Sequence, residues 1–141
     1  MRSRPTTALP AELRGMQRQT YLTRRRVDDS RVVLRLEGEH DVDSAARLGR
    51  ELEEVFESGA DAIVDLSRAE FIDSSILGVL AHAHRVAESS AQVRLVVIAP
   101  PDSQAARLFD LVGARDFIPT LPSLGAAVDP HGMLNSKGRP G

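Results

Sequence analysis

The chain has 141 residues, 42% of them hydrophobic, and a formal net charge of −2, which suits one domain with its own core. This charge excludes a general attraction to nucleic acid or anionic lipid, and no apolar run reaches the roughly 20 residues that cross a bilayer. The first residues lack the apolar stretch of a secretory signal, so we expect a cytoplasmic protein without membrane insertion. The absence of cysteine excludes disulfides and thiolate metal sites.

The two ends of the chain differ in composition from its middle. Residues 1–18 mix arginines with Pro5, Pro10 and Gly15, which predicts a basic flexible extension. Residues 129–141 are rich in glycine and proline and predict a disordered tail. The extension has no aromatic residues on which bases could stack, so we expect no nucleic-acid partner. One domain is therefore expected over residues 19–128.

Within that domain, the hydrophobic pattern alternates between the strand and the helix period. Strands are predicted at residues 20–27, 31–36, 62–66, 93–99 and, at an edge, 116–118. Helices are predicted at residues 41–57, 74–88, 102–112 and 123–128. The first two strands form a hairpin around Asp28-Asp29-Ser30, and the later strand–helix–strand order predicts a right-handed βαβ unit. The expected fold is α/β, a mixed sheet of about four to five strands with helices packed mainly on one side.

The sequence contains little that would indicate an enzyme or a metal-binding protein. His82 and His84 are two residues apart on a predicted helix and point to nearly opposite sides, so they cannot chelate one ion. The sequence has no nucleophile elbow, no phosphate loop ending in lysine and no dinucleotide fingerprint. We therefore expect no catalytic residue, no cofactor and no metal.

The segment Asp73-Ser74-Ser75 follows a buried strand and opens a helix. Aspartate and serine are good helix N-caps, and capping alone explains these three residues. The same position also exposes a hydroxyl beside backbone N–H groups that no helical carbonyl can satisfy, and such groups bind phosphate well. Both interpretations remain open from these residues alone.

The surrounding segments closely resemble STAS-domain anti-sigma factor antagonists over residues 20–128. The similarity is carried by the segments Gly38-Glu39-His40-Asp41, Val64-Asp65-Leu66-Ser67, Phe71-Ile72-Asp73-Ser74-Ser75, Leu77-Gly78 and Arg107-Leu108-Phe109 with Gly113. The resemblance implies a STAS-like single domain that binds an anti-sigma factor serine kinase and thereby frees a sigma factor. It further implies that the kinase phosphorylates Ser74, that phosphorylation releases the kinase, and that a metal-dependent serine phosphatase reverses it.

The resemblance also implies which residues lie around Ser74, whose phosphorylation would act as the switch. Asp41 and Asp73 match acidic positions that line the phosphorylation site, Ser75 flanks that site, and Gly78 belongs to the same diagnostic block. Ile76 stands where the family generally has glycine, and its side chain is expected to affect or select the partner. We expect a monomer or weak dimer.

Two other functions are compatible with the sequence. The basic extension and Ile76 motivate a non-switching STAS scaffold, or an accessory subunit of a sensory complex or lipid-transport ATPase. Hydrolysis of a small molecule by Ser74 ranks far below, because no histidine can be placed beside it from the sequence.

Overall fold

A five-stranded mixed sheet forms the centre of the molecule, in the strand order β1-β2-β3-β4-β5. The computed structural model describes residues 20–128, so the predicted extension and tail lie outside the described residues. The strands are β1 (Thr20–Asp28), β2 (Arg31–His40), β3 (Asp61–Ile72), β4 (Leu95–Ile98) and β5 (Thr120–Leu121). β1 is antiparallel to β2, and every later pair is parallel. The predicted α/β fold is confirmed.

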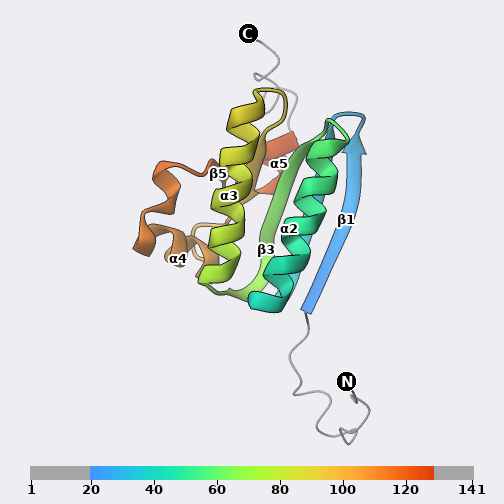
Figure 1. Ribbon diagram of the computed structural model, residues 1–141. Helices are drawn as coiled ribbons and strands as arrows, with labels where there is room; N and C mark the ends of the chain where they lie inside the picture. The colour runs from blue at the N-terminus through green and yellow to red at the C-terminus, as the bar shows by residue number, and fades with distance from the viewer. Residues whose placement is uncertain (1–19, 129–141) are drawn as a thin grey trace, which may run out of the picture.

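Helices cover mainly one face of this sheet (Figure 1). The helical elements are α2 (Val42–Glu57), α3 (Ser74–Ser90), α4 (Gln104–Val112), the 3₁₀ helix η2 (Ala114–Asp116) and α5 (Leu124–Val128). Buried side chains of α2, α3 and α4 form one core with alternate residues of β2 and β3. Within residues 20–128, only α5 packs on the opposite face, where Ala127 belongs to a second buried cluster with Val33, Ile63, Val96 and Ile98. The expectation that helices lie mainly on one side is thus confirmed.

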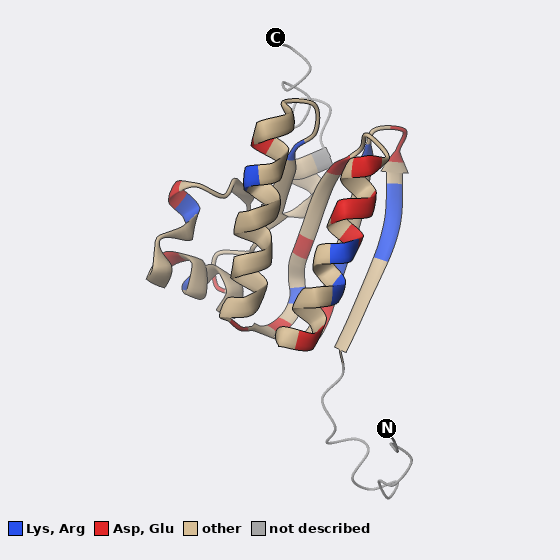
Figure 2. Cartoon of the chain, in the orientation of Figure 1, with Lys and Arg blue, Asp and Glu red and all other residues tan. Residues whose placement is uncertain are grey.

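The edge strand β1 is tied to α2 by charge. Arg24 Nη1 lies 3.1 Å from Glu51 Oε1 and 3.0 Å from Glu54 Oε1. Figure 2 shows the basic residues of β1 beside the acidic residues along α2. These side chains are partly exposed, so the pairing orients α2 over the hairpin more than it stabilises the fold.

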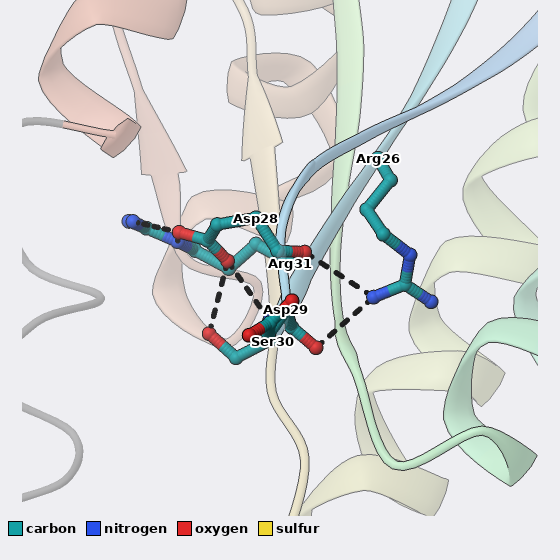
Figure 3. A network of polar contacts seen from close by, with 5 residues as sticks. All are labelled: Arg26, Asp28, Asp29, Ser30 and Arg31. Atoms are coloured by element: carbon teal, nitrogen blue, oxygen red, sulfur yellow. Dashed lines mark hydrogen bonds and ion pairs between the residues drawn. The ribbon is translucent and has the colours of Figure 1, made fainter.

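The predicted turn of the hairpin is held by its own side chains (Figure 3). The Asp28 carboxylate accepts hydrogen bonds from the Ser30 amide at 2.9 Å and from Arg31 Nε at 3.0 Å. Arg26 Nη1 donates to the carbonyl oxygens of Asp28 and Asp29, at 3.2 and 3.0 Å. The hydrogen bond from Arg31 lowers the pKa of Asp28 to about 2. The turn therefore keeps a charged aspartate across the physiological pH range.

Three strand predictions need correction. β2 continues to His40 instead of ending at Leu36, because it stays paired with β3. β3 continues to Ile72 instead of ending near Leu66, because it stays paired with β2 through two register irregularities. The strand predicted at residues 116–118 is wrong. The chain forms η2 there instead, and the Phe117 and Ile118 amides both donate to Ala114 O, at 3.1 and 2.9 Å.

The last strand begins only after Pro119. The Pro119 carbonyl accepts from the Val97 amide at 3.0 Å, while proline itself has no N–H to donate. Pairing with β4 therefore starts at this carbonyl and continues into β5.

Candidate functional site

The ends of β2 and β3 lie side by side and each leads into a helix. His40 pairs with Ile72 in the parallel register, and the Asp73 amide donates to the His40 carbonyl at 3.2 Å. Asp41 then caps α2, and Asp73 caps α3. Both helices consequently begin at the same edge of the sheet, which brings the segments of Asp41 and Ser74 together.

Asp73 organises the start of α3. Its Oδ1 accepts the Ser75 amide at 2.9 Å and also accepts the Ser75 hydroxyl. On the neighbouring helix, Asp41 Oδ1 accepts the Asp43 amide at 3.1 Å. Ser75 is thus engaged in local capping, and its hydroxyl is already bonded.

The Ser74 side chain, unlike that of Ser75, takes no part in capping. Ser74 is the first residue of the 17-residue helix α3 and is exposed. Within residues 20–128, its hydroxyl makes no hydrogen bond. A negative charge added to this oxygen would stand at the positive end of the helix dipole, which stabilises it by up to about 1 kcal/mol at an exposed site. Ser74 therefore offers an accessible acceptor oxygen.

The two neighbours after Ser75 have different roles in packing. Ile76 is 0% exposed and belongs to the main core, because the third residue of α3 faces the sheet. A direct contact between its side chain and a partner, as the sequence led us to expect, is therefore not available in this structure. Gly78 is exposed, and a Cβ atom there would meet nothing within 4 Å.

Two residues that sequence reasoning did not single out for the site, Gln104 and His40, hold the chain next to it in place. The Gln104 side-chain amide of α4 accepts the Ile72 amide at 2.9 Å and donates to the Ile72 carbonyl at 3.0 Å. This pair of bonds clamps the residue just before Asp73. His40 is buried, with Nε2 lying 2.9 Å from the Glu37 carbonyl, and burial lowers the pKa of its imidazole. No local sequence signal marks Gln104 as a clamp, because its partner is 32 residues away.

Acidic groups surround the acceptor, since Asp41, Asp43 and Asp73 all lie where α2 and α3 begin (Figure 2). Among residues 20–128, no group of three or more His, Asp or Glu side chains is placed to hold a metal ion. No helix in the same part of the chain is long and apolar enough to cross a membrane.

Known structures share this fold. The anti-sigma factor antagonist SpoIIAA in its unphosphorylated form matches with a TM-score of 0.59 and 22% identity, over 73% of this chain and 89% of that one. The Bacillus cell fate determinant SpoIIAA in its phosphorylated form matches with a TM-score of 0.61 and 24% identity, over 77% of this chain and 97% of that one. An anti-sigma factor antagonist from Mycobacterium paratuberculosis matches with a TM-score of 0.64 and 24% identity, over 79% of this chain and 92% of that one.

No curated protein matches the chain by sequence. A family model described as "Mlab, STAS domain" matches residues 23–121, which is more than half of the chain and nearly all of the described domain. The matched region contains β2, β3, β4 and β5 and both capped helices of the site. The chain therefore belongs to the STAS domain family.

Proposed function

We propose that this STAS domain is a phosphorylation-switched protein-binding module that acts as an anti-sigma factor antagonist. It binds an anti-sigma factor serine kinase while Ser74 is unmodified and releases it once Ser74 carries a phosphate. The observation that carries this proposal is the exposed, unbonded Ser74 hydroxyl at the start of α3. Support also comes from the similar fold of proteins described as anti-sigma factor antagonists. In this role the domain is a kinase substrate and performs no catalysis itself.

The proposed switch follows from charge. The kinase transfers the γ-phosphoryl group of ATP to Ser74 Oγ, ADP leaves, and the hydroxyl proton goes to a kinase base. The new phosphate carries about −1.5 to −2 charges and faces the phosphates of ADP. Two like charges 4 Å apart repel by about 4 kcal/mol at an effective dielectric of 20. That repulsion weakens binding roughly a thousandfold.

The modified domain itself need not unfold. The α3 N-terminus stabilises the phosphate, as helix N-termini do generally. The buried Ile76 and the Gln104 clamp hold the loop in place on either side. The two forms then differ mainly at the surface, and a metal-dependent serine phosphatase can restore the binding form by removing the exposed group.

Intact-mass measurement after incubation with candidate anti-sigma factor kinases and Mg-ATP tests the acceptor. We expect one phosphate on wild type and on Ser75→Ala, and none on Ser74→Ala. Equal uptake by wild type and Ser74→Ala would rule out Ser74. Binding of the same kinase to Ser74→Asp should be weaker than to Ser74→Asn, which has the same shape without the charge.

A non-switching scaffold remains the second candidate, because the matching family model is described as Mlab rather than as an antagonist. Such a scaffold, including an accessory subunit of a sensory complex or lipid-transport ATPase, would form a stable complex whatever the state of Ser74. Size exclusion with light scattering distinguishes the two. Complex formation that is unaffected by Ser74→Asp favours the scaffold.

A further inference from the structure

An open apolar groove runs between α2 and α3 on the outer side of the helical layer. The two helices lie side by side (Figure 1), and the space between them has a volume of about 770 Å³. Its lining includes small or branched residues, among them Ala46, Gly49, Gly78 and Val79. Ser75 also lines it, so the groove begins next to Ser74.

The groove has the length and shape to hold another helix. It follows α2 from Val42 to Glu57, which at 1.5 Å per residue is about 22 Å, or four helical turns. Gly49 and Gly78 present no side chain, and small residues let helix backbones approach closely. Val42 at one end is 65% exposed and Val86 at the other is 42% exposed. An apolar stripe therefore extends along the whole groove and remains open to solvent in the isolated chain.

Acidic residues lie at both ends of the groove. Both helices begin at the switch end, where their positive dipole ends stand beside Asp41, Asp43 and Asp73. Glu53 and Glu57 line the other end. Unlike Glu51 and Glu54, which pair with Arg24, these two glutamates have no ion-pair partner within residues 20–128. Arg50 also lines the groove, but the two glutamates outnumber it. The groove therefore favours a basic occupant.

We propose that this groove receives a basic amphipathic helix of the anti-sigma factor kinase. The proposal rests on the function proposed above and extends it. Apolar residues of the partner helix at positions i, i+4, i+7 and i+11 lie against the small residues of the groove. Basic residues of the partner helix pair with Glu53 and Glu57.

This arrangement links affinity to the switch. The groove begins next to Ser74, because Ser75 lines it. A kinase whose helix lies in the groove is thereby held beside the Ser74 hydroxyl, and a phosphate on Ser74 repels that same bound partner.

The affinity of the kinase for groove variants tests the proposal. Gly78→Leu fills the groove, and its control is Gly125→Leu in α5, on the other face of the sheet. Neither glycine has a positive φ, and a Cβ atom at Gly78 meets nothing within 4 Å, while one at Gly125 meets Ser123 Oγ at 3.9 Å. We expect at least a tenfold loss of affinity for Gly78→Leu and no change for Gly125→Leu.

Variants at the far end separate the groove from the switch loop. Val86 lies 12 residues after Ser74 along α3, about 18 Å away. Val86→Gln and Glu57→Lys should each weaken binding several-fold, whereas Glu88→Lys, outside the groove, should not. Thermal melts check that each variant is folded, which we expect because Val86, Glu57 and Glu88 are exposed.

The outcomes distinguish this proposal from the one on which it rests. If Ser74→Asp weakens binding but Gly78→Leu, Val86→Gln and Glu57→Lys bind as wild type does, the groove proposal is wrong and the switch stands. If no kinase binds wild type, both proposals fail. A doubled solution mass of wild type that Gly78→Leu abolishes would assign the groove to a second copy and overturn the proposal.

Discussion

Asp73 combines two roles, capping of α3 and negative charge beside Ser74, and two substitutions separate them. Asp73→Ala removes the acceptor of the Ser75 amide and of the Ser75 hydroxyl. Asp73→Asn retains a good cap but removes the charge. Because Ser75 depends on this one carboxylate for both bonds, we expect the alanine variant to be clearly less stable than the asparagine variant.

The magnitude follows from the two bonds. Loss of an N-cap costs about 1 kcal/mol, within a range of 0.5–2. Loss of the favourable charge at the helix dipole costs a further 0.3–1 kcal/mol or so, and this part is shared by both variants. For a domain of about 110 residues, 1 kcal/mol at the midpoint corresponds to a Tm shift of about 4 °C. We therefore expect Asp73→Ala to melt about 4 °C below Asp73→Asn.

Urea and thermal unfolding of the two variants and wild type provide the measurement. Asp43→Ala is a suitable control, since Asp43 is exposed in the first turn of α2 and its side chain caps nothing. Equal melting temperatures for Asp73→Ala and Asp73→Asn would show that the capping bonds do not contribute as the geometry indicates. If Asp73→Asn also loses phosphorylation at Ser74 while remaining folded, the carboxylate contributes charge to kinase recognition.

Two further predictions concern the core. Burial lowers the pKa of His40 below its usual 6.5, so the unfolded chain binds more protons and stability falls as the pH drops below about 6.5. Urea unfolding of His40→Gln should show a weaker fall between about pH 7 and 5, and an unchanged pH dependence would contradict this. Phe109→Ala, at a fully buried position, should cost about 3–5 kcal/mol, whereas Phe117→Ala, 52% exposed, should cost less than about 1 kcal/mol by the same assay.

The local signals in the sequence were sufficient for most of the fold. Asp41 and Asp73 were recognisable as caps because each precedes a run of apolar residues at helical spacing. Gly59 and Gly113 both adopt positive φ, at 85° and 73°, where the helices end. These features depend on residues within one or two turns, so the sequence alone contains them.

Other features depend on distant partners and could not be read locally. β3 extends to Ile72 because β2 is beside it, although Ser67 and Arg68 interrupt the apolar pattern. The burial of Ile76 depends on how α3 sits on the sheet, and the Gln104 clamp joins segments far apart in the chain. The groove likewise exists only once α2 and α3 are packed together.

The two outer strands of the sheet differ greatly in length, and both resist unwanted association. β5 has only two residues and lies between Pro119 and Pro122, so it offers almost no template to another chain. β1 has nine residues, but its middle carries three consecutive arginines, Arg24 to Arg26. Arg24 is paired with Glu51 and Glu54, but two copies meeting along β1 would bring the like charges of Arg25 and Arg26 together. The sheet is thereby protected at both borders from the edge-to-edge growth that leads to aggregates and fibrils.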